Sequence, residues 1–271
     1  MPAPVEIPAA VVADVDGTIA GADHQVSPRT LDTLAALERR GVPVILATGR
    51  SEANVLAIAR RAGLTTPAIA CNGALVVDPV SGDRLRVRTV APADVSTMIE
   101  LHRRTGAALT WWTPEQIFVT SERLKAELAQ LGDGEIEVVA APEPPPQDVL
   151  KIMLNGTAAQ LDAIGDIVTE ALPRVTRSLP TFWELSAQDG DKWGALEWLF
   201  RRLEIDPDGV LGIGDGGNDV RWLARVGRPV AMANAHPSVH EVAVAVAGHH
   251  ADEGAAEFLM QEVNSWPEVA S

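Results

Sequence analysis

The chain has 271 residues, a length that fits one large domain or two smaller ones, and 46% of them are hydrophobic, enough for a sizeable core. Its 22 basic and 37 acidic residues give a net charge of −15, which argues against binding to nucleic acid or to anionic membranes. No apolar run has the length of a membrane span, and we expect no signal peptide. The single cysteine, Cys71, excludes an intrachain disulfide and fits a reducing cytoplasm.

The first predicted strand, residues 11–13, leads directly into two aspartates. Asp14 and Asp16 are one residue apart, and Gly17 marks where the chain leaves the strand. Because residues i and i+2 of an extended segment point the same way, both carboxylates can face one small volume. Like charges held this close repel unless a cation or a shared proton lies between them, which suggests an oxygen-preferring cation such as Mg²⁺. An acidic turn after a strand is the simpler interpretation.

The following segments alternate between helix and strand. A helix is predicted over 27–40, with Ser27 as its cap, and a buried strand follows at 43–47. Another helix begins near Ser51, and a third strand and turn occupy 68–74. This alternation predicts a parallel sheet with helices on both faces, the arrangement of a Rossmann-like α/β domain.

A polar segment, Thr48-Gly49-Arg50, lies where a strand passes into a helix. A hydroxyl, a flexible glycine and free backbone N–H groups at such a place suit a phosphate. An ordinary turn with Ser51 as the helix cap explains the same residues. Further on, Asn72-Gly73 is typical of a turn. We interpret the neighbouring cysteine as a small buried residue rather than a nucleophile.

From about residue 84 the pattern changes to α+β, with hairpins mixed with helices. Helices are predicted near 92–104, 121–131 and 157–171, and strands near 107–112, 116–119, 136–140, 149–154 and 181–185. We interpret 84–186 as a second domain inserted into the first, with a stiff surface connection at 141–147. Its tryptophans Trp111, Trp112 and Trp183 are expected in the core or on the sheet, and one of them lining a substrate pocket is the alternative.

Beyond the insertion, Asp191 can cap a helix that runs to about residue 202, which puts Lys192 in its first turn. The helix dipole disfavours a lysine there unless an anion lies nearby. A lysine exposed on the surface is the other interpretation.

Another buried strand, 209–215, leads into Gly216-Gly217-Asn218-Asp219. Residues 212–217 match the dinucleotide-binding pattern G-x-G-x-x-G, but Asp215 would put a negative charge where a pyrophosphate must lie, and the match comes late in the chain. We therefore reject that interpretation.

A final buried strand is predicted at 229–232. Near the end, His249-His250 with Asp252 and Glu253 could suggest a second metal site. A loop in which Asp252 caps the last helix is the preferred interpretation.

Taken in order, these segments resemble the four motifs of the haloacid dehalogenase superfamily of phosphohydrolases. Asp14-x-Asp16-Gly17-Thr18 resembles the first, Thr48 the second, Lys192 the third, and Gly214-Asp215-x-x-Asn218-Asp219 the fourth. The pattern is most similar to the Cof-type group, with its α/β cap (the C2B type) inserted after the second motif. The resemblance implies a catalytic core at 1–83 and 187–271 and a cap at 84–186.

The resemblance also implies roles for individual residues. Asp14 would be the nucleophile, and Asp16 would be the general acid and base. Mg²⁺ would be held by Asp14, the backbone carbonyl of Asp16 and Asp215, with Asp219 supporting the metal ligands. The phosphoryl group and substrate would contact further residues, which are Gly17, Thr48, Gly49, Lys192 and Asn218.

The chain departs from the family pattern at two tryptophans. Trp193 stands where a glycine usually follows the lysine, and Trp222 replaces a common methionine. The first departure leaves the local backbone path open, and the second is expected to be a change of packing. Asn72-Gly73 and Asn234-Ala235 resemble steps near the Cof-type site.

The resemblance implies a cytoplasmic, Mg²⁺-dependent phosphatase acting on a small phosphorylated metabolite through an aspartyl phosphate. A phosphomutase similar to phosphomannomutases and a non-catalytic phospholigand-binding protein are the alternatives. Neither the metabolite nor the oligomeric state follows from the sequence, and no nucleic acid or membrane partner is expected.

Overall fold

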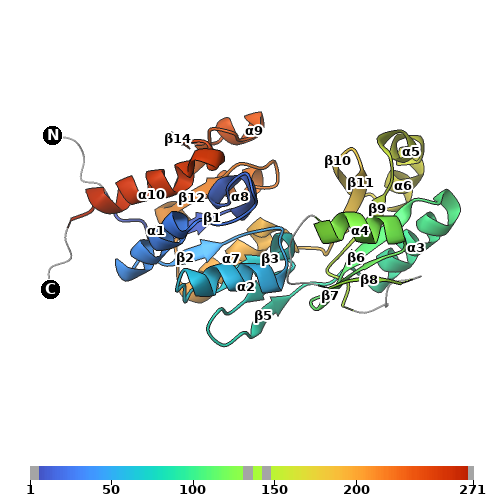
Figure 1. Cartoon of the computed structure of the whole chain (residues 1–271), viewed down its shortest axis with the longest axis horizontal. Helices are drawn as coiled ribbons and strands as arrows, with labels where there is room; N and C mark the ends of the chain where they lie inside the picture. Colours follow the sequence, from blue (N-terminus) through green and yellow to red (C-terminus); the bar gives the residue numbers. More distant parts are fainter. Residues whose placement is uncertain (1–5, 131–136, 142–147, 268–271) are drawn as a thin grey trace.

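The computed structural model describes residues 6–130, 137–141 and 148–267, which form two lobes side by side (Figure 1). The larger lobe is built on a parallel sheet with the strand order β14-β13-β12-β1-β2. Its strands are β1 (Ala10–Ala13), β2 (Val44–Leu46), β12 (Val210–Gly214), β13 (Arg228–Met232) and β14 (Ala245–Ala247). The two ends of the chain therefore contribute to one sheet.

The central strands β1, β2 and β12 are short and fully apolar because both faces of the sheet are covered there. In the middle of the sheet, Val11 lies between Leu211 of β12 and Val44 of β2 in register, and all three are completely buried. Continuous apolar runs of this kind are typical of parallel strands buried on both sides.

Helices pack on both faces, as the alternation of the sequence predicts. The helices of this lobe are α1 (Pro28–Arg39), α2 (Glu52–Arg61), α7 (Lys192–Leu203), α8 (Val220–Leu223), α9 (Pro237–His240) and α10 (Gly254–Ser265). One apolar cluster joins Leu34 of α1 with Leu259 of α10, and a second joins Leu196 of α7 with Trp222 of α8. The prediction of a parallel sheet between helical layers is confirmed.

The predicted third strand takes a different place from the one expected. β3 (Ala68–Ala70) touches the parallel sheet at a single bridge, Ala47 to Ile69, and otherwise pairs antiparallel with β4 (Leu75–Val77). The chain reverses at Cys71 and Asn72, which both have positive φ angles. Because the chain reverses so tightly after β3, the next strand, β4, must run antiparallel to β3.

The smaller lobe is the α+β insertion. Its sheet has the order β10-β11-β9-β6-β7-β8. The strands are β6 (Ala108–Trp112), β7 (Gln116–Val119), β8 (Glu137–Ala140), β9 (Lys151–Asn155), β10 (Thr176–Leu179) and β11 (Phe182–Ser186), and the helices are α3 (Pro92–Thr105), α4 (Glu122–Gln130), α5 (Ala158–Ala163) and α6 (Gly165–Ala171). The α+β character of the insertion is confirmed.

Two details of the insertion differ from the sequence-based expectation. The helix predicted over 157–171 is two helices, which meet at Ile164, where the backbone (φ −105°, ψ 0°) departs from helical geometry. Strand β10 was not predicted. Most of the predicted connection at 141–147 lies outside the described residues.

Strand β5 (Arg84–Val87) lies at the start of the predicted insertion. It pairs with β4 in the small antiparallel sheet of the larger lobe rather than with the strands of the insertion. The domain division at 83/84 and 186/187 stays a prediction.

The three tryptophans of the insertion contact different parts of the structure. Trp111 is completely buried and stacks on Phe118 at 5.3 Å between ring centroids. Trp183 donates its indole N–H to the carbonyl of Leu161 (3.3 Å). Trp112 packs instead against the apolar cluster of the larger lobe, so it lies where the two lobes meet.

The C-terminal segment corrects one further expectation. Asp252 does not cap the last helix: it ends the short turn His250–Asp252, and Glu253, at φ 56° and ψ 33°, precedes the first helical residue without a side-chain cap. The chain enters α10 through this left-handed residue. The next residue must be glycine, because a Cβ at Gly254 would lie 2.2 Å from the carbonyl carbon of Gly248. Strand β14 was also not predicted.

The packing of Trp222 on β12 generates a stability prediction. A Cβ added at Gly212 would lie 2.5 Å from the Trp222 ring, closer than side chains approach. Gly212→Ala should therefore lower the free energy of unfolding by about 1–3 kcal/mol through overpacking. Urea unfolding measures this, with Gly217→Ala as the control, because a Cβ at Gly217 meets nothing within 4 Å. Equal stabilities of the two variants would contradict the prediction.

Candidate active site

The site begins where β1 ends. The N–H of Asp14 donates to the carbonyl of Ile213 (3.0 Å), so the ladder between β1 and β12 continues into the first motif. The chain then turns at Gly17, whose φ is +74°. A Cβ at this glycine would lie 2.2 Å from a carboxylate oxygen of Asp215, so only glycine lets the turn approach that side chain.

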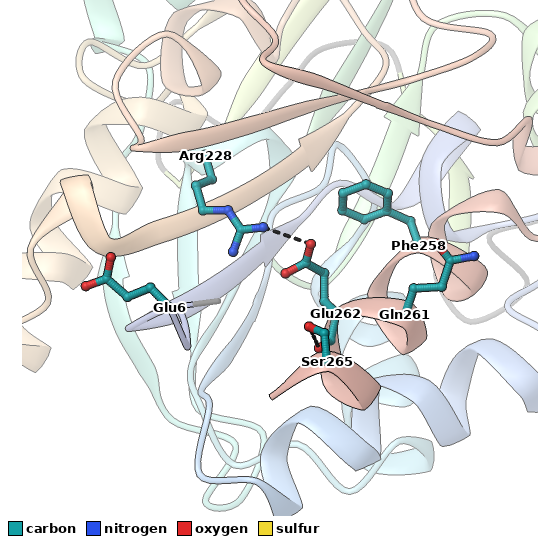
Figure 2. Close-up of a pocket in the computed structure, with 6 residues that line it drawn as sticks. All are labelled: Glu6, Arg228, Phe258, Gln261, Glu262 and Ser265. Carbon is teal, nitrogen blue, oxygen red and sulfur yellow. Dashed lines mark hydrogen bonds and ion pairs between the residues drawn. The ribbon is translucent and has the colours of Figure 1, made fainter. Parts of the chain in front are cut away.

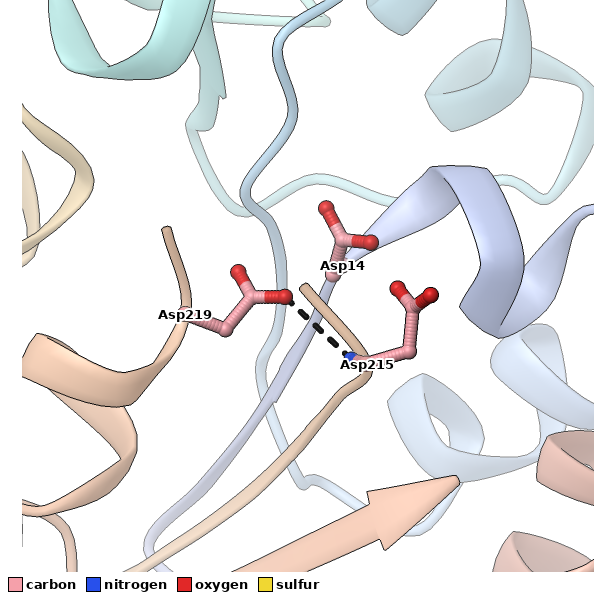
Figure 3. Close-up of side chains that lie close together, drawn as sticks. All are labelled: Asp14, Asp215 and Asp219. Carbon is pink, nitrogen blue, oxygen red and sulfur yellow. Dashed lines mark hydrogen bonds between the residues drawn. The ribbon is translucent and has the colours of Figure 1, made fainter. Parts of the chain in front are cut away.

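Three carboxylates gather at this edge of the sheet (Figure 3). Asp14 follows β1, Asp215 follows β12, and Asp219 lies directly before α8. Asp14, Asp215 and Asp219 each offer an oxygen within 4.8 Å of the other two. The hydroxyl of Thr18 lies 3.2 Å from Asp14 Oδ2 and 3.1 Å from Asp215 Oδ1, so it can donate to either. Such a group of oxygen ligands is suited to a hard divalent cation.

Lys192 contacts two of these three carboxylates. It is the first residue of α7, only 2% exposed, and its Nζ donates to Asp14 Oδ1 (2.5 Å) and Asp219 Oδ1 (2.7 Å). The carboxylate of Asp191 caps the helix at the N–H of Gly194 (2.7 Å), as predicted. The interpretation of Lys192 as a surface lysine is therefore wrong.

Asp219 is fully buried and accepts hydrogen bonds from several directions. The backbone N–H groups of Asp215 (3.2 Å) and Gly216 (2.9 Å) donate to its Oδ2, while Lys192 and the indole of Trp222 (2.9 Å) donate to its Oδ1. Trp222 thus does more than change the packing: it adds a donor that a methionine lacks. Asp219 is held rigidly as the partner that orients Lys192.

Asp16 points away from the carboxylate cluster. The guanidinium of Arg50 donates to its carboxylate from Nε (3.0 Å) and Nη2 (2.7 Å). Burial alone would raise the pKa of Asp16, but hydrogen bonds and charge from Arg50 outweigh it and hold the pKa below its usual range. The predicted contribution of Asp16 to a metal is its backbone carbonyl, and that stays a prediction.

The loops of the second and fourth motifs meet beside the cluster. Thr48 is buried, and its hydroxyl accepts the N–H of Arg50 (3.0 Å). The amide of Asn218 donates to Asn72 Oδ1 (3.3 Å), and a Cβ at Gly49 would lie 3.0 Å from the same oxygen. The structure thus brings the predicted phosphate-binding segments together around Asn72, while their roles stay predictions.

Charge in the cluster is unbalanced. Burial and the neighbouring charge of Asp219 raise the pKa of Asp14 to about 8, despite the opposing effect of Lys192. Burial and Asp219 likewise raise the pKa of Asp215. For Lys192, burial opposes the charged form, but the charges of Asp14 and Asp219 prevail and raise its pKa. One ammonium does not neutralise three carboxylates, so the residues present fit an additional cation.

Three contributors were not given a role from the sequence. Thr18 and Arg50 were quoted as parts of motifs, but nothing in their spacing indicates that one contacts two aspartates and the other binds Asp16. Asn234 donates to the carbonyl of Gly17 (2.8 Å) and to Asp215 Oδ2 (3.3 Å). Its only sequence signal was the resemblance of Asn234-Ala235 to a step near the site.

A separate pocket of about 440 Å³ lies at the opposite edge of the sheet (Figure 2). Its lining includes Arg228, which begins β13 and forms an ion pair with Glu262 at 2.8 Å. Ligands of open α/β sheets bind at the carboxyl ends of the strands, and this pocket lies at the amino ends. The acidic cluster is therefore the stronger candidate for an active site.

Comparison with known proteins decides the family. A sequence profile of haloacid dehalogenase-like hydrolases matches residues 11–259. The chain belongs to this family. It is 30% identical over 262 residues to a phosphoglycolate phosphatase of Methanopyrus kandleri, covering 94% of this chain and 98% of the relative. An HMP-PP phosphatase of Serratia proteamaculans is 29% identical, with 93% and 94% covered.

Solved structures give the same fold. A haloacid dehalogenase-like hydrolase of Bacteroides thetaiotaomicron superposes with a TM-score of 0.83 at 23% identity, covering 93% of this chain and 98% of the other. The predicted enzyme class, a phosphatase of this superfamily, is confirmed, as is the fold of a parallel-sheet core with a cap. Among the residues that the structure describes, no helix is long and apolar enough to cross a membrane.

The unbalanced cluster predicts that stability falls as pH rises when divalent cations are removed. The carboxyl of Asp14 has an ordinary pKa of 3.8 in the unfolded chain and about 8 in the folded protein. The folded state therefore holds the proton more tightly, and this contribution, complete below pH 3.8, is lost as pH rises through 8. In EDTA, the stability of the wild type minus that of Asp14→Asn should fall by at least about 1 kcal/mol between pH 5 and 8.5.

Urea unfolding across this pH range makes the measurement. Asp32→Asn is the control, because Asp32 lies exposed on α1 and is not part of the carboxylate cluster. A difference between wild type and Asp14→Asn that stays constant with pH would show that Asp14 does not titrate in this range.

Proposed function

We propose that the protein is a Mg²⁺-dependent phosphomonoester hydrolase that acts on a small phosphorylated metabolite through an aspartyl-phosphate intermediate. The observation that supports this most strongly is the bond between buried Lys192 and Asp14 at the end of β1. A carboxylate that must attack an anionic phosphoryl group needs positive charge beside it. Lys192 supplies that charge from a buried position, where water does not screen it. The two relatives from M. kandleri and S. proteamaculans are also named as phosphatases of small phosphorylated compounds.

The proposed reaction has two steps. An oxygen of Asp14 forms a bond to phosphorus while the bond to the leaving oxygen breaks, and Asp16 gives that oxygen its proton. Asp16 then takes a proton from water, whose oxygen attacks the phosphorus, and inorganic phosphate leaves with Asp14 restored. The ion pair with Arg50 must open before Asp16 carries a proton, since Arg50 stabilises the ionised form.

Positive charge and backbone donors would hold the phosphoryl oxygens through both steps. Lys192, Thr48 and the N–H groups near Gly17 and Gly49 are proposed for this role, and Asn218 for contact with substrate or phosphate. Mg²⁺, held by Asp14, Asp215 and the carbonyl of Asp16, would offset the charge of the phosphoryl group when bound. Asp219 would act indirectly by fixing Lys192 and the N–H of Asp215.

Two other functions are less well supported. A phosphomutase would use the same intermediate but return the phosphoryl group to a sugar, so release of inorganic phosphate from a monoester distinguishes the two. A non-catalytic phospholigand-binding protein would not need a general acid beside a nucleophile, and here Asp14 and Asp16 are both present. The net charge of −15 fits neither nucleic acid nor an anionic membrane as partner, and a cytoplasmic location follows from the single reduced cysteine only as part of this proposal.

Removing the nucleophile should abolish turnover and leave the fold intact. Asp14→Asn should retain less than about a hundredth of the wild-type kcat, and Asp16→Asn should be nearly as severe, given the size of covalent and acid–base effects. Phosphate release from p-nitrophenyl phosphate and from alkyl phosphates measures this, with circular dichroism as the check on folding. An Asp14→Asn enzyme that retains more than about a hundredth of the wild-type kcat would remove Asp14 from its role.

Activity should depend on Mg²⁺. EDTA should abolish turnover, Mg²⁺ should restore it, and Ca²⁺ should support it poorly because its looser coordination misplaces the attacking carboxylate. Asp215→Asn should raise the Mg²⁺ concentration for half-maximal activity at least about tenfold, through loss of a charged ligand. Asp208→Asn, on the exposed turn before β12, serves as the control. Full activity in metal-free buffer would contradict the proposal.

A further inference from the structure

Lysine is rare in this chain, and its positions are informative. Of the 22 basic residues only Lys125, Lys151 and Lys192 are lysines, and all the others are arginines. Two of the three are buried: Lys192 among the carboxylates of the site, and Lys151 in the cap, where it is 7% exposed. A buried ammonium is costly unless an anion or several acceptors compensate it.

Among the described residues, the ammonium of Lys151 contacts an aromatic ring rather than an anion. Its Nζ lies 3.9 Å from the centroid of the Trp112 ring, a cation–π contact that offsets part of the cost of burial. Across residues 6–130, 137–141 and 148–267, no carboxylate pairs with it and no oxygen accepts a hydrogen bond from it. An aromatic face takes up none of its three N–H donors in conventional hydrogen bonds, so this cation retains its capacity to bind an anion.

The fold places Lys151 on the side of the cap sheet away from the cap's own core. Along β9, Ile152 and Leu154 point into the apolar core of the cap beneath helices α3 and α5, so Lys151 and Met153 point to the opposite face. Its register neighbours on that face are Trp112 of β6 and Ser186 of β11.

Lys151 also lies at the end of the cap that joins the catalytic domain. Leu150, the residue before it, belongs to the apolar cluster of the catalytic domain, and Trp112 packs against that cluster. From Ser186, beside Lys151, six further residues bring the chain to Lys192, a path of at most about 20 Å. The N–H of Gly190 donates to the carbonyl of Ala187 (3.0 Å), and the turn that this bond closes shortens the path. The two buried lysines therefore flank the junction of cap and core.

We propose that Lys151 is a specificity-determining residue that binds an anionic group on the leaving part of the substrate, while Lys192 binds the phosphoryl group. This inference rests on the proposed function. Because the protein carries a charge of −15, a substrate with a second negative charge must find local positive charge at both ends. A carboxylate or a second phosphate has the shared chemistry that Lys151 would recognise.

The test compares matched substrates that differ in one charge. Phosphoglycolate is set against 2-hydroxyethyl phosphate, and glucose 1,6-bisphosphate against glucose 6-phosphate. The wild type should prefer the charged member of at least one pair, and the pair that responds identifies carboxylate or phosphate. Lys151→Met, which keeps the length of the side chain, should lower kcat/KM for the charged member about 10- to 100-fold more than for the neutral one, the effect of losing a hydrogen-bonded charge.

Two further variants separate charge from folding. Lys151→Arg keeps the charge and should retain part of the preference, while Lys125→Met removes a charge from helix α4 of the cap and should leave every ratio unchanged. An equal loss on both members of each pair, or a wild type that prefers the neutral ones, would overturn the proposal.

A binding measurement keeps this test independent of turnover. In the Asp14→Asn background, calorimetric affinity for the preferred anionic compound should fall at least about tenfold on adding Lys151→Met. If the wild type releases no phosphate from any compound but this loss of affinity is seen, the proposed hydrolysis is wrong and the role of Lys151 stands. If phosphate is released and the affinity is unaffected, the role of Lys151 is wrong.

Discussion

The burial of one ammonium among three carboxylates is the interaction on which the rest of the site depends. Lys192 can lie at the start of a helix, inside the protein, only because Asp14 and Asp219 meet it at hydrogen-bond distance. Asp219 can do so because backbone N–H groups and the Trp222 indole fix its carboxylate. The group is still short of positive charge: burial and the neighbouring charge of Asp219 raise the pKa of Asp14 although Lys192 opposes them.

The same cluster requires unusually close approach of separate chain segments. A side chain at Gly17 would collide with the carboxylate of Asp215, and a side chain at Gly73 would lie 2.1 Å from the carbonyl of Asp191, the residue that caps α7. The turn after β3 therefore packs directly against the backbone that presents Lys192. The guanidinium of Arg86 reinforces this arrangement by donating to the carbonyls of Gly73 (2.9 Å) and Asp189 (2.6 Å).

How much the sequence reveals differs between the two domains. In the core, buried strands are continuous apolar runs that end in polar motifs, so Asp14, Lys192 and Asp215 could be located from local pattern and resemblance. The ion pair of Asp16 with Arg50 could not, because residues 34 positions apart carry no local signal of contact. In the cap, half-exposed strands such as β10 alternate weakly, and only the register of β9 shows that Lys151 faces away from the cap core.

Hydrogen bonds on either side of the domain boundary show which residues can move between the two domains. On the core side, Arg86 donates to the carbonyls of Gly73 and Asp189. On the cap side, the N–H of Val90 donates to the carbonyl of Val149 (2.7 Å). The residues between these two sets of bonds are the ones that can absorb a change of angle between the domains.

Across the boundary, Arg84 also bridges Glu52 and Glu115, but its side chain is 35% exposed and that of Glu115 62%. Exposed pairs of this kind contribute about 0–1 kcal/mol each, so separating the lobes costs little there and leaves the buried bonds of Lys192 intact. The cap is thus joined to the rigid catalytic cluster by exposed charges that separate at little cost and by the apolar packing of Leu150 and Trp112. Only the second kind of contact must be broken at a cost when a substrate enters or a product leaves.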